Sequence, residues 1–268
     1  MIHVKLHAVL MDLGETLVHF AKPWEEVSYA QIREVYAYLN YSGLQTDFQS
    51  FAQTLVRVYN GAAARSDTFK IEISMEEIIA KTLSKFNVKN LSTEFLQKAT
   101  KFYFMPEIDA WQPYTDAVDT LSRLTESKFK LGIVSNAKSE WVVHEILSKY
   151  DLQKYFGTVI TSAAMRIRKP RPDIFSKALK DLEVEAKDAV FIGDSLEADI
   201  SGAKKVGMHS IYVSRKPQEN PSMTFPEATV FSLTEAVDTI MLWDTRCSQV
   251  QNQQERGAYS SIAHKVLN

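Results

Sequence analysis

The segment Ala189-Val190-Phe191-Ile192-Gly193-Asp194 is a short apolar run that ends in a carboxylate. Near-continuous apolar runs of this length are typical of strands buried on both faces of a parallel sheet. Four further runs have the same apolar character: residues 8–11 followed by Asp12, residues 131–134 followed by Ser135 and Asn136, residues 158–161, and residues 210–213. The sequence therefore predicts a sheet of at least five mainly parallel strands.

Helical patterns separate most of these runs, over residues 114–127, 138–150, 172–183 and 197–206. Alternation of strands and helices favours βαβ units, and so an α/β fold with a doubly wound sheet. A last short strand is expected near 229–231. It precedes a helix opened by Ser232 and Glu235, which have capping-box spacing.

Residues 18–109 contain no convincing strand pattern and instead carry four amphipathic stripes. Such stripes predict four helices, enough for a small bundle inserted after the first strand. Ser74 and Glu77 form a capping-box pair before the third stripe. The stripes are Ile32/Val35/Tyr36/Leu39, Phe51/Leu55/Val58, Met75/Ile78/Ile79/Leu83 and Phe95/Ala99/Phe102/Tyr103.

These patterns divide the 268 residues into three parts. Residues 1–17 and 110–243 are expected to form the α/β core, and residues 18–109 a helical insertion. Residues 244–268 are rich in Gln and Ser and are expected to be a polar tail with little fold of its own.

Composition excludes several classes of protein. Lys and Arg number 31 against 33 Asp and Glu, a net charge of -2, whereas nucleic-acid binders usually carry a basic excess. Cys247 is the single cysteine, which leaves neither a disulfide framework nor a cysteine zinc site. The N-terminus lacks a signal-peptide profile, and no apolar run approaches the roughly 20 residues that span a bilayer. A cytoplasmic protein with no membrane or nucleic-acid partner is expected.

Polar residues that can carry chemistry follow the predicted strands. Asp12, Ser135 and Asp194 each come at a strand end, and Lys169 lies in the loop after the third strand. Ligands of doubly wound sheets bind beyond the carboxyl ends of the strands. Asp12, Ser135 and Asp194 alone could each cap a helix or shape a turn, and Lys169 alone could be a solvated loop lysine. Their order along the chain favours a joint site.

This ordered set resembles the haloacid dehalogenase-like hydrolase superfamily. The matching segments are Asp12-Leu13-Gly14-Glu15-Thr16, Ser135-Asn136, Lys169 to Phe175, and Gly193 to Asp199. The resemblance covers residues 7–243. It implies a Rossmann-like core, with the helical insertion acting as the cap.

The resemblance also implies a role for each residue. Asp12 is expected to be the nucleophile and a ligand of Mg²⁺, together with Asp194 and the backbone carbonyl of Gly14. Lys169 would neutralise charge, and Asp199 would orient Lys169 or metal-bound water. Ser135 would donate a hydrogen bond to the substrate phosphate, with Leu13, Gly14, Asn136 and Lys169 also at the substrate. A carboxylate at a strand end can form a covalent intermediate, and Mg²⁺ suits phosphate chemistry.

Gly14 departs from the family pattern, because the phosphatases usually have an acid there that protonates the leaving group. Glu15 or His19 could replace that acid. The dehalogenase branch also lacks it, so a 2-haloacid dehalogenase is the alternative, although that branch does not keep the pair Gly193-Asp194. A phosphonate-cleaving enzyme would need a cap lysine such as Lys22 or Lys70. A degenerate binding module is the non-enzymatic alternative.

The expected function is therefore Mg²⁺-dependent hydrolysis of a small phosphorylated metabolite through an aspartyl phosphate at Asp12, by a monomer or homodimer. The cap is expected to select the substrate. Its candidate anion-binding residues are Arg33, Arg57, Arg65 and Lys70, although charges of this kind are more often solvated on a helix surface.

Overall fold

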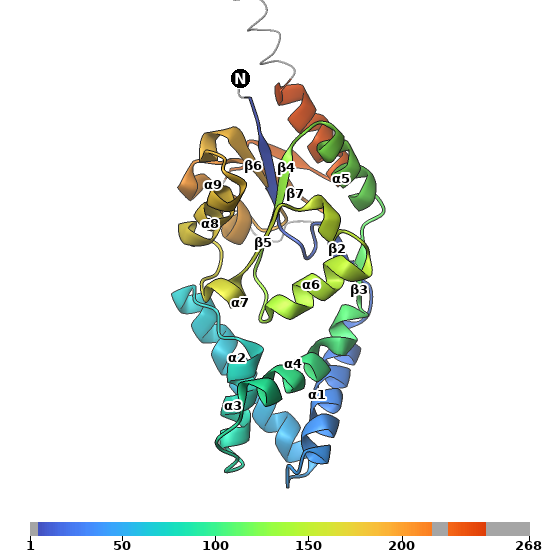
Figure 1. The fold of residues 1–268 in the computed structure, drawn as a ribbon, viewed down its shortest axis with the longest axis vertical. Helices are drawn as coiled ribbons and strands as arrows, with labels where there is room; N and C mark the ends of the chain where they lie inside the picture. The colour runs from blue at the N-terminus through green and yellow to red at the C-terminus, as the bar shows by residue number, and fades with distance from the viewer. Residues whose placement is uncertain (1–4, 216–224, 245–268) are drawn as a thin grey trace, which may run out of the picture.

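A computed structural model describes residues 5–215 and 225–244 of the chain (Figure 1). Six strands form one sheet in the order β5-β4-β1-β6-β7-β8, and every pairing is parallel. The predicted doubly wound sheet is confirmed. Its strands are β1 (Ala8–Met11), β4 (Lys130–Ser135), β5 (Thr158–Thr161), β6 (Ala189–Gly193), β7 (His209–Val213) and β8 (Ala228–Val230).

Helices cover both faces of this sheet because its apolar side chains alternate between two cores. Ala8 and Leu10 of β1 pack in one cluster with Phe175 of α8, whereas Val9 and Met11 belong to the other. Figure 1 shows α8 and α9 on one side and α5 with helical residues 233–244 on the other. The helices of this part are α5 (Ala117–Glu126), α6 (Glu140–Lys149), α7 (Ser162–Met165), α8 (Pro172–Leu182) and α9 (Ser201–Val206), with short turns η1 (Gln153–Tyr155), η2 (Ala186–Asp188) and η3 (Leu196–Ile200).

The four helices expected between residues 18 and 109 are present: α1 (Trp24–Tyr41), α2 (Phe48–Phe69), α3 (Met75–Ser84) and α4 (Thr93–Ile108). Their apolar stripes bury Val35, Leu39, Phe51 and Leu55. The capping box at α3 is confirmed, since the Ser74 hydroxyl accepts from the Glu77 N–H and the Glu77 carboxylate accepts from the Ser74 N–H. Figure 1 shows this helical group beyond the ends of the strands, on one side of the α/β part.

Two short strands join the helical group to the sheet. β2 (Val18–Phe20) and β3 (Trp111–Pro113) pair antiparallel, His19 opposite Gln112. The expectation of no strand within 18–109 is therefore wrong for Val18–Phe20. Three residues are too few for a strand period to be recognised in sequence.

The C-terminal elements differ slightly from expectation. The last strand is Ala228–Val230, and the Ser232 hydroxyl accepts from the Glu235 N–H as expected. The Glu235 carboxylate accepts from Phe231 rather than from Ser232, so the capping box is not closed. The predicted tail from 245 onward, with Cys247, lies outside the described residues. Within the described residues no helix has the length and apolarity to cross a bilayer.

Candidate active site

A cavity of about 430 Å³ lies between the strand ends and the helical group. Parallel strands present their carboxyl ends at one edge, and the order β4-β1-β6 makes three of those ends neighbours. Asp12, Ser135, Asn136 and Lys169 line the cavity from the core. Tyr59, Glu72, Tyr103, Phe104 and Glu107 line it from the helical insertion. Most residues of the predicted site thus line one cavity.

A buried ionic chain lies on the core side of this cavity. The Lys169 Nζ is 2.7 Å from Asp12 Oδ1 and 2.6 Å from Asp199 Oδ1. Lys169 is only 3% exposed and Asp199 only 1%. Burial alone would lower the pKa of Lys169, but the charges of Asp12 and Asp199 raise it overall. The ammonium therefore stays charged beside the Asp12 carboxylate.

Backbone contacts hold Lys169 in this place. The Asn136 Oδ1 accepts from the Lys169 N–H at 2.9 Å, and the Asn136 Nδ2 donates to the Lys169 carbonyl at 3.3 Å. The side chain of Asn136, expected at the substrate, is therefore engaged with the main chain of Lys169.

The position of Asp199 follows from a close approach to the chain at Gly193. A Cβ atom at Gly193 would overlap the Asp199 side chain, so this position must be glycine. The wide turn η3 carries Asp199, whose Oδ2 accepts from the Ser195 N–H at 3.0 Å. The Gly-Asp pair of the sequence motif thus leaves room for the carboxylate that meets Lys169.

Three carboxylates converge where a metal ion was expected. Asp12, Asp194 and Asp199 each offer an oxygen, all within 4.8 Å of one another. Burial raises the pKa of Asp194 to about 7, and the charges of Asp12 and Asp199 add to the effect. Lys169 is the one cation that pairs with this group among the described residues. The excess negative charge fits a divalent cation with oxygen ligands.

Trp111 fills the space beside Gly14. A Cβ built at Gly14 would lie 3.1 Å from Cη2 of the Trp111 indole. Gly14 does not have a left-handed backbone, whereas Glu15 does, with φ of 55°. The side chain of an acid at position 14 would therefore compete with the indole for the same volume.

The two suggested replacements for that acid are engaged elsewhere. Glu15 accepts from the Phe20 N–H at 3.3 Å and from the Tyr114 hydroxyl at 3.4 Å, although it does line the cavity. His19 packs on Tyr114 with ring centroids 4.9 Å apart and does not line the cavity.

The cap cations suggested by sequence do not line the Asp12 cavity either: Lys22, Arg33, Arg57, Arg65 and Lys70. Lys70 pairs with Glu197 at 3.0 Å outside the cavity. The cations that do line it, besides Lys169, are Lys138 and Arg168.

Sequence reasoning assigned no role to Glu72, Lys138 or Arg168. The Glu72 carboxylate is buried and lies 3.2 Å from the Lys138 Nζ and 3.2 Å from the Arg168 Nη1. It also accepts from the Ser162 hydroxyl at 2.7 Å. The alternation Ile71-Glu72-Ile73 and the position of Arg168 beside Lys169 are the signals that could have found this group.

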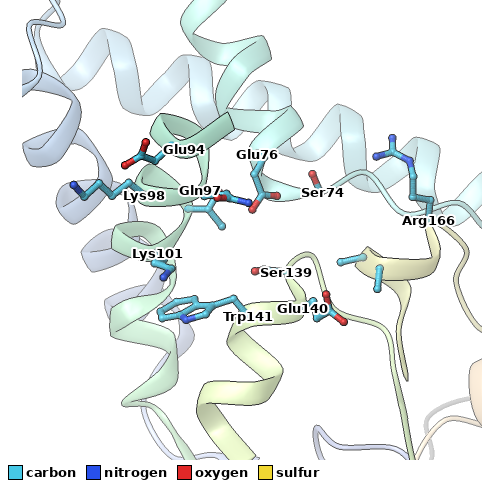
Figure 2. Close-up of a pocket in the computed structure, with 13 residues that line it drawn as sticks. Ser74, Glu76, Glu94, Gln97, Lys98, Lys101, Ser139, Glu140, Trp141 and Arg166 are labelled. Atoms are coloured by element: carbon cyan, nitrogen blue, oxygen red, sulfur yellow. The ribbon is translucent and has the colours of Figure 1, made fainter. Parts of the chain in front are cut away.

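A second pocket of about 620 Å³ lies between α3 and α4 of the helical group and α6 and α7 (Figure 2). It is larger than the cavity at Asp12. Its lining includes Glu94, Lys98, Lys101 and Trp141, but none of the residues predicted to carry chemistry. Volume alone therefore does not identify the active site. The site is identified by the charged groups that converge at Asp12.

Comparison with known proteins finds hydrolases by both family model and sequence. The family model for haloacid dehalogenase-like hydrolases matches residues 44–213. The glyceraldehyde 3-phosphate phosphatase of Methanopyrus kandleri is 30% identical over 217 residues, which are 78% of this chain and 84% of that protein.

Solved structures agree on the fold. A HAD phosphatase from Thermococcus onnurineus matches with a TM-score of 0.60 and 25% identity, over 88% of this chain and 98% of that chain. A 2-haloacid dehalogenase from Pseudomonas syringae pv. Tomato matches with a TM-score of 0.66 and 21% identity, over 89% and 99%, a likeness in fold alone. Family match, fold and strand-end motifs together establish that this chain belongs to the haloacid dehalogenase-like hydrolases.

Proposed function

We propose that this hydrolase is a phosphatase that cleaves a small phosphorylated metabolite through an aspartyl phosphate on Asp12. The observation that carries the proposal is the Asp12 carboxylate held 2.7 Å from the buried Lys169 ammonium on the wall of a cavity. The relative from Methanopyrus kandleri, named as a glyceraldehyde 3-phosphate phosphatase, supports a phosphate ester as substrate.

The residues divide the work as follows. Asp12 attacks phosphorus, and Lys169 neutralises charge on the phosphoryl oxygens, since it keeps its proton between two carboxylates. Ser135, which lines the cavity at the end of β4, donates a hydrogen bond to a phosphoryl oxygen. Asp199 keeps Lys169 oriented through its 2.6 Å ion pair. Preorganised charges of this kind are the main source of phosphoryl-transfer catalysis.

Mg²⁺ would be held by Asp12, Asp194 and the backbone carbonyl of Gly14. When bound, it would neutralise charge on the phosphate oxygens. Asp199 is the third carboxylate of the cluster, but its ion pair with Lys169 assigns it to orientation rather than to the metal.

The test compares two substrate classes on the full chain. With Mg²⁺, we expect phosphate release from p-nitrophenyl phosphate, acetyl phosphate and glyceraldehyde 3-phosphate, and loss of that release when EDTA removes the metal. Asp12→Asn should retain less than a few per cent of the activity, because an amide keeps the volume but is a poor nucleophile. Unchanged circular dichroism would show that the variant is folded.

Chloride release from 2-chloropropionate is measured in parallel. Release of chloride without metal, with no phosphate from any ester, would identify a dehalogenase instead. Release of neither product would favour a binding module. In either case the phosphatase proposal is wrong.

A further inference from the structure

The cavity contains a carboxyl group with no partner of opposite charge among the described residues. Its carboxyl side chains are Asp12, Glu15, Glu72, Glu107 and Asp199. Asp12 and Asp199 pair with Lys169, and Glu72 pairs with Lys138 and Arg168. Cations thus hold the carboxyl groups of Asp12, Asp199 and Glu72 in place. Burial raises the pKa of Asp199 to about 6, but its ion pair with Lys169 fixes its position.

Glu107 differs because its contacts are neutral. In the last turn of α4, its Oε2 accepts from the Gln31 Nε2 at 2.7 Å, and its Oε1 accepts from the Trp111 Nε1 at 3.4 Å. Glu15 also accepts from neutral groups, but its hydrogen bonds tie it to β2 and to Tyr114, and its side chain fixes the turn after β1. Glu107 is therefore the cavity carboxyl best suited to hold a proton.

The surroundings of Glu107 favour the protonated form of its carboxyl group. Tyr59 of α2 and Tyr103 of α4 face it from two helices, while α1 and β3 contribute the neutral Gln31 and Trp111. Burial raises the pKa of Glu107, and its two hydrogen bonds oppose this only in part. Burial, with the charges of Glu107 and Glu72, raises the pKa of Tyr59 to about 12, so Tyr59 is a neutral neighbour at physiological pH.

Trp111 connects this carboxyl to the position where the family carries its acid. One edge of the indole fills the space beside Gly14, and its Nε1 on the five-membered ring bonds to Glu107. The indole that lies against position 14 thus also bonds to a carboxyl group that lines the same cavity from the helical insertion.

We propose that Glu107 is the general acid and base of this enzyme, in place of the residue missing at Gly14. The inference rests on the proposed phosphatase function. In the first step Asp12 bonds to phosphorus, the bond from phosphorus to the leaving oxygen breaks, and that oxygen takes the proton of Glu107. In the second step water attacks the aspartyl phosphate and gives a proton to Glu107, which releases phosphate and restores both carboxyl groups.

The test uses Glu107→Gln, which keeps the shape of the side chain but cannot exchange the proton. Nitrophenolate leaves without a proton, so the variant should still release one equivalent of nitrophenol from p-nitrophenyl phosphate in a burst. Its later turnover should fall about 10²–10⁴-fold, because water is no longer activated. Glyceraldehyde 3-phosphate, whose alkoxide needs a proton, should show the same loss and no burst.

Two variants control for structural damage. Glu94→Gln changes an exposed carboxyl on the same helix, in the second pocket, and should behave as the wild type. Glu107→Asp keeps a carboxyl group and should recover part of the turnover that the Gln variant loses.

The outcomes separate the two proposals. Wild-type protein that releases no phosphate from any ester overturns the phosphatase function, and this assignment with it. An active wild type whose Gln variant is unchanged, or loses both substrates equally without a burst, overturns Glu107 alone. Equal losses in the folded Asp and Gln variants would also overturn it.

Discussion

At Gly14 the decisive contact is with an aromatic ring. The glycine backbone is not in the left-handed region, so conformational freedom does not explain the residue. The indole of Trp111 explains it better, because a Cβ atom at this position would lie 3.1 Å from the ring. Bringing an acid to this turn therefore requires the ring to move, which a side chain that also bonds to Glu107 resists.

We expect Gly14→Asp alone to destabilise the protein by about 1–3 kcal/mol, the usual cost of overpacking. It should give no gain on alkyl phosphates. Combined with Trp111→Ala, which vacates the space, the new carboxyl should raise kcat/KM on alkyl phosphates relative to Trp111→Ala alone. Urea unfolding and steady-state kinetics measure the two effects. Improved alkyl turnover in the single variant, without loss of stability, would show that the indole yields freely.

The connections between the helical insertion and the core include two short antiparallel pairings. The first is the β2–β3 pair. The second joins residues 70–72 to residues 166–168, where the Glu72 N–H donates to the Arg166 carbonyl and the Arg168 N–H donates to the Lys70 carbonyl. At the cavity wall, the Glu72 carboxylate adds ion pairs with Lys138 and Arg168 to the second pairing.

Glu72→Ala should weaken this connection. Lys138, Arg168 and Ser162 lose a shared acceptor, which should cost about 1–3 kcal/mol of unfolding free energy. Protease cleavage near residues 66–74 should become faster. Asp67→Asn removes only the exposed partner of Arg168, at 3.5 Å, and serves as the control, with a change below about 1 kcal/mol. Equal stability and protease resistance in the two variants would show that Glu72 does not fasten the insertion.

Sequence pattern predicted elements with strong local signals. The five parallel strands of four to six residues, the four inserted helices and the capping box of Ser74 and Glu77 all have such signals. β2 was missed because three residues carry no readable period. The family resemblance, rather than the strand ends alone, led to the prediction that Asp199 would lie at Lys169, near Asp12.

Glu107 and Trp111 could not have been found in this way. On α4, Glu107 looks like an ordinary surface charge near the end of a helix, and only the packing of α1, α4 and β3 turns it into the cavity. Roles that depend on three distant segments leave no local signal in the sequence.

For the whole molecule, a buried proton on Glu107 makes stability depend on pH. In the unfolded chain this carboxyl titrates near its ordinary value of 4.5, and in the folded chain its pKa is higher. Between the two values the folded state holds a proton that the unfolded state has released. Stability then falls as pH rises through this window, by up to about 1.4 kcal/mol per pH unit, and levels off above the folded pKa.

Glu107→Gln removes this titration and with it the loss of stability. Relative to the wild type, the variant should therefore gain stability steadily as pH rises from 4.5, until the folded pKa is reached. Urea unfolding of both proteins across this range, in EDTA to exclude metal binding, measures the difference. Glu94→Gln, an exposed carboxyl on the same helix, should show no such trend. A difference between wild type and Glu107→Gln that does not change with pH would mean that Glu107 is ionised in the folded protein, and so holds no proton to donate.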